Sequence, residues 1–335
     1  MTLRAMESFG HAPTGAVTSA DLLSNQWTAL SGGFALVDLT GGRKYLYRTA
    51  NGACTLALDS DLSTLLMGFR FHNRSNTNRE VFATFLDGAG ALGLLLKEKT
   101  SGHLSYIVGT YISPRILTTT VATAAGSDDH WVIKVVFDDV AGSVEFYKNG
   151  VLDSSVSGVD TIGIGTECDS ISFFSNYYQY GAFGFSDLWV DDATNHGETT
   201  VLYRPVDAAG SSADWTATGA GTNEACVDEV PPDDDTTYNV SGTVADLDQL
   251  GQTGMDGAVG SVLAVQAHVR ARKEAAGVTT MKLGLLHSGT HSQGAAVSLN
   301  ETYEQRTAIF EDVPGGSGWT TAEFDAAEVT YEHDS

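Results

Sequence analysis

Alternation of apolar residues with a period of two is the feature of this sequence that most limits its fold. In HWVIKVVFDD (130–139), the large apolar residues that share one face of an extended strand are Trp131, Ile133, Val135 and Phe137. Val132 and Val136 make the opposite face partly apolar, which favours a sheet covered on both sides. Helical periodicity of useful length is missing from the sequence, so the predicted class is all-β.

Turn signals separate further strands in the first two hundred residues. Asn149–Gly150 lies between two strand-like runs, a pattern typical of a two-residue β-hairpin. GFRFHN (68–73) and FSDLWVDD (185–192) have the composition of additional strands. Residues 1–205 therefore predict an antiparallel β-sandwich or jelly roll.

The pattern changes after residue 205. Residues 206–261 are rich in Gly, Ala, Ser, Thr and Asp, and they predict an extended acidic connector. Residues 262–335 predict a smaller β-rich domain with one short helix, for which Thr320 is the N-cap and Glu323 completes a capping box. The alternative is that the connector and the C-terminal part form one unit.

The net charge of the chain is −24, and it is unevenly distributed. Residues 1–205 hold 21 acidic and 13 basic residues, whereas residues 206–335 hold 21 acidic and 5 basic residues. Such a chain repels nucleic acid, so we expect no nucleic-acid partner. No apolar stretch has the length of a signal peptide or a membrane span, so we expect no membrane insertion.

Three cysteines, Cys54, Cys168 and Cys226, are too few and too widely spaced for a disulfide framework or a metal-ligand motif. We expect them to be reduced and mostly buried. This is the usual state of thiols in a protein that folds in a reducing cytoplasm.

Three segments resemble the laminin-G-like or concanavalin A-like jelly roll. They are the strand that Trp131 opens, the aromatic-x-Asn-Gly hairpin YKNG (147–150) and the late strand FSDLWVDD. The resemblance implies a β-sandwich for the N-terminal domain.

The order of several strings along the whole chain resembles a family of tailed-bacteriophage virion structural proteins. The strings are MTLRAMESFGH, LYRPVDAAGSSADWTATG, DEVPPDDDTTY, AVQAHVRARKEAAG and GWTTAEFDAAEV. The resemblance implies a virion protein assembled in the host bacterial cytoplasm, with other virion proteins and copies of itself as partners. Tail or tail-fibre placement, with contact to the host surface, is the first expectation, and decoration of the head is the alternative.

The resemblance to concanavalin A-like domains also raises the question of glycan hydrolysis. Retaining enzymes of that fold carry Glu-x-Asp-x-Glu on one strand, because the mechanism needs two carboxyls about 5 Å apart. The sequence has no such string, and VEFYKNG contributes only Glu145. We therefore expect a non-enzymatic protein. A carbohydrate-binding adhesin is one alternative, and a glycan-degrading enzyme is a less favoured one.

Calcium is the one metal that the jelly-roll resemblance implies, and no other cofactor is expected. Lectin-like domains bind calcium through loop oxygens, and the aspartates that lie at predicted strand ends are Asp138, Asp139, Asp191 and Asp192. The other interpretation is that these are solvated turn aspartates.

The stretch FFSNYYQYGAFGF (173–185) is rich in aromatic residues. Tyr177, Tyr178 and Tyr180 are candidates for stacking on a host glycan or for anchoring a protein partner. Alternatively, alternate rings fill the core, which is the prediction for Phe173, Phe183 and Phe185.

The acidic string DEVPPDDDTTY (228–238) and a basic strand face form a candidate docking pair. Asp233, Asp234 and Asp235 supply the carboxylates, while Arg270 and Arg272 share one face of the strand 262–272. We expect them to dock between domains or subunits. The alternative is that the acids are turn residues and the arginines are solvent-exposed.

Overall fold

A computed structural model describes residues 3–12, 14–17, 26–39, 43–75, 79–109, 112–174, 183–255, 260–274, 277 and 279–335, and the structural statements below concern these residues. The chain divides into two compact units, which we call unit 1 (Met1–Leu202) and unit 2 (Tyr203–Ser335). Within the described part of the chain, no helix has the length and apolar character that crossing a membrane requires.

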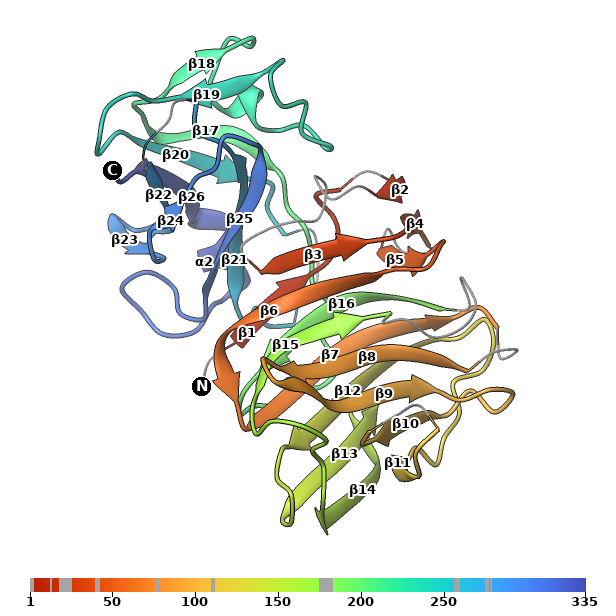
Figure 1. The fold of residues 1–335 in the computed structure, drawn as a ribbon. Helices are drawn as coiled ribbons and strands as arrows, with labels where there is room; N and C mark the ends of the chain where they lie inside the picture. Colours follow the sequence, from red (N-terminus) through yellow and green to blue (C-terminus); the bar gives the residue numbers. More distant parts are fainter. Residues whose placement is uncertain are drawn as a thin grey trace. The chain divides into compact units, whose positions relative to one another are not determined.

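Unit 1 is an antiparallel sandwich of two large sheets (Figure 1). The strands of the first sheet, in spatial order, are β14 (Val151–Val159), β13 (Gly142–Lys148), β12 (Asp128–Val136), β7 (Thr64–Asn73), β16 (Phe183–Asp191), β5 (Lys44–Arg48), β4 (Phe34–Asp38) and β2 (Gly15–Val17), and β1 (Leu3–Glu7) also pairs with β16. The strands of the second sheet are β11 (Arg115–Thr118), β10 (Leu104–Ile107), β9 (Gly90–Lys97), β8 (Glu80–Asp87), β15 (Cys168–Phe173), β6 (Ala53–Leu62) and β3 (Trp27–Ser31). The predicted all-β jelly-roll sandwich is confirmed.

Alternation along β7 explains how one strand serves both the core and the surface of the first sheet. Its core side chains, each fully buried between the sheets, are Leu65, Met67, Phe69 and Phe71. The intervening residues Gly68, Arg70 and His72 lie on the outer face, because successive strand residues point in opposite directions.

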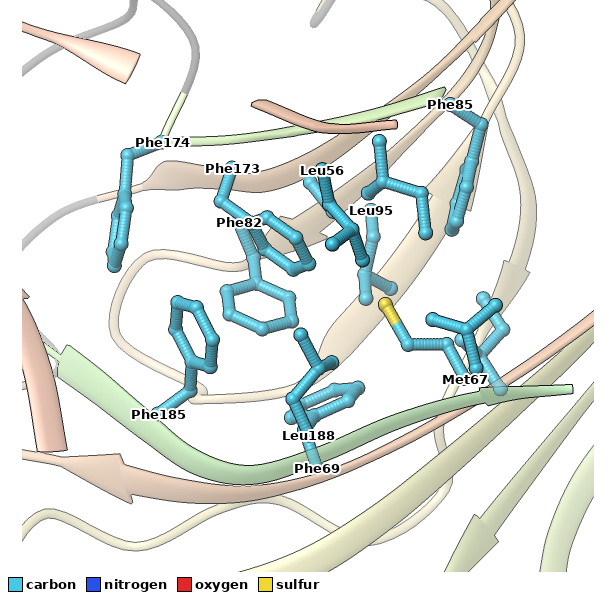
Figure 2. Packing of buried hydrophobic residues seen from close by; sticks show 14 of the residues in the cluster. Leu56, Met67, Phe69, Phe82, Phe85, Leu95, Phe173, Phe174, Phe185 and Leu188 are labelled. Atoms are coloured by element: carbon cyan, nitrogen blue, oxygen red, sulfur yellow. The ribbon is translucent and has the colours of Figure 1, made fainter. Parts of the chain in front are cut away.

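Phe82 of β8 is the centre of the aromatic packing between the two sheets. Its ring centroid lies 4.5 Å from that of Phe69 and 5.5 Å from that of Phe185, both on the first sheet. Figure 2 shows these rings meeting in the space between the sheets, with Phe173 beside Phe82. The prediction that Phe173, Phe183 and Phe185 are core residues is confirmed, since each is at most 1% exposed.

β13 and β14 form the predicted hairpin. Asn149 has a φ of 48° and Gly150 a φ of 80°. Two successive residues in the left-handed region are what a type I′ turn requires, and Asn and Gly adopt that region at the lowest cost.

Unit 2 is built from one larger sheet and two small ones (Figure 1). The larger sheet contains, in order, β17 (Val206–Ala213), β20 (Leu247–Gln252), β26 (Glu328–His333), β22 (Thr280–His287) and β23 (Thr290–Gln293), with β24 (Val297–Ser298) also paired to β22. The small sheets are β18 (Thr216–Thr218) with β19 (Tyr238–Val240), and β21 (Val265–Ala271) with β25 (Glu304–Phe310). The helical segments are η1 (Glu224–Cys226) and α2 (Thr321–Ala326).

Residues 206–261, expected to be an extended connector, instead supply four strands of unit 2. β17 pairs with β20, and β20 pairs with β26 near the C-terminus. Asp248 of β20 is fully buried and accepts hydrogen bonds from Trp215 N, Asn223 Nδ2 and Tyr331 Oη at 2.9, 2.5 and 2.7 Å. A buried polar network with satisfied partners holds this segment, and such a network leaves no apolar periodicity in the sequence.

The predicted capping box of the short helix is confirmed. Glu323 N donates to Thr320 Oγ1 at 3.2 Å, and Thr320 N donates to Glu323 Oε2 at 2.8 Å. The three cysteines are free and buried.

The central position of Phe82 predicts that Phe82→Ala strongly destabilises unit 1. Removing the ring leaves a cavity between the sheets, with an expected loss of about 3–5 kcal/mol in the free energy of unfolding. Urea unfolding followed by tryptophan fluorescence measures this loss. The control Ile112→Ala removes a side chain that is 70% exposed, and should change stability by no more than about 0.5 kcal/mol. An unchanged midpoint for Phe82→Ala would contradict the packing described here.

Candidate functional site

A row of polar and aromatic residues crosses four neighbouring strands on the outer face of the first sheet. Strand pairing sets His72 of β7 opposite Asp128 of β12 and also opposite Gly184 of β16. Gly184 is in turn opposite Tyr47 of β5. We call Asp128, His72, Gly184 and Tyr47 the first row. Side chains directly opposite on one face of a sheet are in contact distance, so the row forms one surface.

A second row lies two residues further along the same strands. Arg70 is opposite both His130 and Ser186, and Tyr45 precedes Tyr47 by two positions on β5. Arg70 Nη2 forms an ion pair of 2.9 Å with Glu198 Oε1, in the segment that follows β16. We call His130, Arg70, Ser186 and Tyr45 the second row.

Asp187 ties the segment after β16 to the sheet. It lies in a β-bulge of β16 with a φ of 49°, and it is 1% exposed. Asp187 Oδ2 lies 3.0 Å from Arg43 Nε and 3.5 Å from Arg70 Nε, while Val201 N donates to Oδ1 at 3.0 Å. Burial raises the pKa of Asp187, and the Val201 N–H and the two arginines act against that rise. The segment after β16 thus covers the second row, and the ion pairs of these charged groups hold that segment in place.

His130 of the second row is fully buried, and neither ring nitrogen has a hydrogen-bond partner within the described residues. Burial lowers the pKa of His130 to about 4, and the charge of Arg70 acts in the same direction. The imidazole is therefore neutral at neutral pH.

Tyr47 of the first row supports an exposed arginine. The ring of Tyr47 lies across Gly184, where a Cβ would come within 2.6 Å of Tyr47 Cζ, so only glycine fits beneath it. Arg74 Cζ lies 3.8 Å from the centroid of the Tyr47 ring. Tyr47 is 1% exposed, whereas Arg74 is exposed. The guanidinium is thus stacked on a fixed aromatic platform at the surface.

An exposed carboxylate lies at the other end of the first row. Tyr45 Oη donates to Asp128 Oδ1 at 2.7 Å. The half-buried ring of His72 lies between these groups and Tyr47, with ring centroids 5.7 Å from Tyr45 and 6.3 Å from Tyr47. Asp128 raises the pKa of His72 and Arg74 lowers it, but burial is the largest effect and the pKa is lowered overall.

These rows are better arranged for binding than for proton transfer. A general acid or base works best with a pKa near the operating pH. Burial raises the pKa of Tyr47 to about 12 and lowers that of His130 to about 4. The exposed groups are one guanidinium and one carboxylate, which form ion pairs and hydrogen bonds with a polar ligand.

The sequence analysis identified three of the four strands of this site, β7, β12 and β16, but missed β5 and the residues that form the site. The available signal was the placement of polar residues at alternate positions of otherwise apolar strands, as in GFRFHN and KYLYR. Their gathering into rows depends on the strand order β12–β7–β16–β5, in which neighbours are far apart in sequence.

Tyr177, Tyr178 and Tyr180, the predicted glycan or partner contacts, lie outside the described residues. The described residues on either side of that stretch, Phe174 and Phe183, are both buried in the core.

Three of the four candidate calcium ligands, Asp138, Asp191 and Asp192, form contacts within the protein. Asp138 Oδ1 accepts hydrogen bonds from Val140 N and Ala141 N at 2.8 and 2.6 Å, which lowers the pKa of Asp138. Asp139 is exposed. In the part of the chain that the structure describes, no three His, Cys, Asp or Glu side chains are grouped to hold a metal ion.

The other two aspartates behave in the same way. Asp191 Oδ1 accepts from Ala193 N and Thr194 N, both at 2.7 Å, and Asp191 Oδ2 lies 2.9 Å from His196 Nε2. Asp192 Oδ2 pairs with Arg4 Nη2 at 2.6 Å. Calcium needs six to eight converging oxygens, and these aspartates do not provide that arrangement.

The acidic string and the basic strand face meet within unit 2. Arg270 donates from Nε to Asp234 Oδ1 at 2.5 Å and from Nη2 to Asp234 Oδ2 at 2.8 Å. Arg272 Nη2 lies 2.8 Å from Asp235 Oδ1. The contact joins two parts of one unit in one chain. Asp233, by contrast, is a turn residue.

The aromatic residue Tyr303 contacts both the acidic and the basic side of this docking pair. Tyr303 Oη donates to Asp235 Oδ1 at 3.1 Å, and its ring centroid lies 5.4 Å from Arg270 Cζ and 4.8 Å from Arg272 Cζ. Stacking of guanidinium groups on a ring fixes their orientation toward the carboxylates.

Comparison with known proteins finds no matching family model and no matching curated protein. Among solved structures, the chain is similar to an endo-β-1,4-glucuronan lyase from the fungus Trichoderma reesei, with 12% identity, a TM-score of 0.37, and coverage of 57% of this chain and 96% of that one. It is also similar to domain 4 of AbnA, a GH43 extracellular arabinanase from Geobacillus stearothermophilus in complex with arabinotriose, with 16% identity, a TM-score of 0.38, and coverage of 56% and 91%. The binding domain of Paraclostridial Mosquitocidal Protein 1 matches with 14% identity, a TM-score of 0.38, and coverage of 56% and 50%. We draw no functional conclusion from likenesses of this size.

The buried neutral His130 predicts a loss of stability in acid. Its pKa is about 4 in the folded chain and about 6.5 when unfolded, so the unfolded state binds the proton more readily and stability falls as the pH drops between these values. His130→Gln cannot take up this proton. It should lessen the loss of unfolding free energy between about pH 7 and about pH 4.5 by roughly 2–3 kcal/mol. Urea unfolding at both pH values measures the difference. The matched control is His291→Gln, at an exposed histidine. The same acid dependence in His130→Gln and in the unmodified protein would contradict the assignment.

Proposed function

We propose that this chain is a non-enzymatic structural component of a tailed-phage virion. It assembles through contacts with copies of itself and with neighbouring virion proteins, in the tail or its fibres, with head decoration as the alternative. The order of strings along the sequence supports the phage context. The observation that carries the assembly role is an exposed apolar surface on unit 1.

This surface lies where the edge strand β14 meets the segment after β11. β14 is the outermost strand of the first sheet and has β13 as its described strand partner. Val151, Leu152 and Val121 are 70%, 51% and 49% exposed. Asp153 links β14 to the segment after β11, because its carboxylate accepts hydrogen bonds from Thr120 N and Val121 N at 2.7 and 2.9 Å. We call Val121, Val151 and Leu152 the apolar edge; exposed apolar groups on an edge strand favour protein contact.

Charge favours a second copy of this chain as the occupant of the apolar edge. A net charge of −24 makes most approaches between copies repulsive. β14 carries one charged residue, Asp153, and its carboxylate is bound within the protein. Two copies that meet along β14 therefore bury apolar side chains with little charge repulsion.

The chemistry of the two rows supports a role without catalysis. The second row is covered by the segment that contains Glu198 and Val201. Its histidine is buried and neutral, and the tyrosine of the first row has a pKa far above neutrality. Groups held in this way do not exchange protons readily at neutral pH.

Recognition of a surface glycan is a second candidate function, which the exposed ends of the first row favour. Arg74 and Asp128 offer a donor and an acceptor on a rigid sheet, next to the half-buried ring of His72. Polar groups fixed on strands suit specific binding of a polar ligand.

Self-association through the apolar edge is testable with the double variant Val151→Asp, Leu152→Asp. Two carboxylates introduced into a symmetric contact repel their counterparts, so association should weaken by roughly tenfold or more. Sedimentation velocity over a range of concentrations measures the change. Ile164→Asp is the matched control, because Ile164 is 56% exposed beside the β8–β9 turn at Gly90. A monomeric unmodified chain at every concentration, or a double variant that associates as before, would count against the proposal.

The absence of catalysis is testable by incubating the full chain with capsule, lipopolysaccharide and acidic polysaccharides. We expect neither new reducing ends nor unsaturated sugar ends, because burial lowers the pKa of His130 to about 4 and raises that of Tyr47 to about 12. A time-dependent appearance of either product, lost on heat denaturation, would overturn the non-enzymatic proposal.

A further inference from the structure

Arg74 has no carboxylate partner among the described residues, and in this it differs from eight other arginines of the chain. The arginines that form ion pairs are Arg4, Arg43, Arg70, Arg79, Arg115, Arg270, Arg272 and Arg306. The chain has 42 Asp and Glu against 18 Lys and Arg, so carboxylates are in excess. An exposed guanidinium left unpaired in such a protein is available to an anion from outside.

The position of Arg74 is fixed before any ligand arrives. Its guanidinium is stacked on Tyr47, and Tyr47 is buried against Gly184 in the first row. Stacking leaves the edge of the planar guanidinium free to donate two parallel hydrogen bonds, which is the geometry that matches a carboxylate. A side chain that is ordered in advance loses less entropy on binding.

The remainder of the first row contains unfilled hydrogen-bonding groups. Asp128 Oδ1 accepts from Tyr45, but Asp128 Oδ2 accepts no hydrogen bond from the described residues. His72 Nδ1 likewise has no hydrogen-bond partner in the described part of the chain. Asp128 is exposed, so its carboxylate is the acceptor of the first row that a hydroxyl group of an outside ligand can reach.

We propose that the first row, with Arg74, binds a carboxylate-bearing sugar residue of a glycan. Arg74 pairs with the sugar carboxylate, Asp128 accepts a hydrogen bond from a sugar hydroxyl, and His72 lies between them. This inference deepens the surface-recognition role proposed above and rests on it.

The combination of charges selects this ligand class. Arg74 and Asp128 are not paired with each other, and both influence the pKa of His72. A simple anion gains from Arg74 but is repelled by Asp128. A neutral sugar satisfies Asp128 but leaves Arg74 without a partner. A sugar acid presents an anion and hydroxyl donors in one rigid ring, and so satisfies both.

The test is isothermal titration of the full chain with oligosaccharides of D-glucuronate. Their carboxyl-reduced, neutral counterparts and acetate serve as comparison ligands. We expect binding of the acidic oligosaccharide, and at least roughly tenfold weaker binding of both comparison ligands, since charge-assisted hydrogen bonds carry much of the affinity. Arg74→Gln should weaken binding by about tenfold or more. The affinity of Arg74→Lys should lie between those of Arg74→Gln and the unmodified chain, because lysine keeps the positive charge but lacks the two parallel N–H donors of the guanidinium.

Two further variants make the test specific. Asp128→Asn should weaken binding of the acidic oligosaccharide less than Arg74→Gln does, because a side-chain amide oxygen still accepts a hydrogen bond. Lys99→Gln removes one exposed positive charge at the turn between β9 and β10 of the second sheet, and should leave affinity unchanged. Tryptophan fluorescence checks that each variant is folded.

The inference is overturned if the acidic and carboxyl-reduced oligosaccharides bind equally, if neither binds, or if Arg74→Gln binds as the unmodified chain does. These outcomes leave the assembly proposal standing, since that depends on sedimentation and not on sugar binding. A different outcome is that the unmodified chain forms unsaturated sugar ends and Arg74→Gln does not. This would support an acidic-sugar site and overturn the non-enzymatic proposal.

Discussion

Apolar packing between the two sheets around Phe82 is the interaction on which the rest of unit 1 depends. Each large ring buried there contributes roughly 1.5–3 kcal/mol, and Phe69, Phe71 and Phe185 on the first sheet can reach Phe82 only if β7 and β16 keep their register. A slip of one residue would turn these rings outward. The same register places Arg70 and His72 on the opposite face. The core thus determines which polar groups meet on the surface.

Electrostatics shapes the rest of the molecule, because acids greatly outnumber bases. Most described arginines are used internally, as in the pairs that Arg43 and Arg70 form with Asp187, or that Arg270 forms with Asp234. Unit 2, with few bases, relies on a buried carboxylate satisfied by neutral donors at Asp248. The pattern is interrupted at the charge-poor strand β14 and at Arg74, which has no carboxylate partner among the described residues. These two places carry the assembly and binding proposals.

Local patterns predicted local structure well. The Asn149–Gly150 turn, the Thr320 cap and the core positions of Phe173 and Phe183 follow from residue chemistry within a few positions. Long-range pairing was beyond the sequence. The first row joins Tyr47, His72, Asp128 and Gly184, which alternation places on outer faces but which only the strand order brings together. Residues 206–261 were expected to be a connector, since their order depends on Asp248 and its donors rather than on an apolar stripe. Three of the four aspartates expected at a calcium site are satisfied by turns and by neighbours such as Arg4.

We propose that the β-sandwich uses one edge for assembly and one face for recognition, without turnover. The central claim of this proposal is that the chain is part of a phage particle and meets a second copy of itself along β14. A cryo-electron microscopy reconstruction of the particle made by the phage that encodes the chain tests this most directly. We predict density for unit 1 in repeated copies, with Val151 and Leu152 buried against a neighbouring copy and the first row facing solvent. The chain's absence from purified particles, or a β14 edge exposed to solvent in every copy, would contradict the claim.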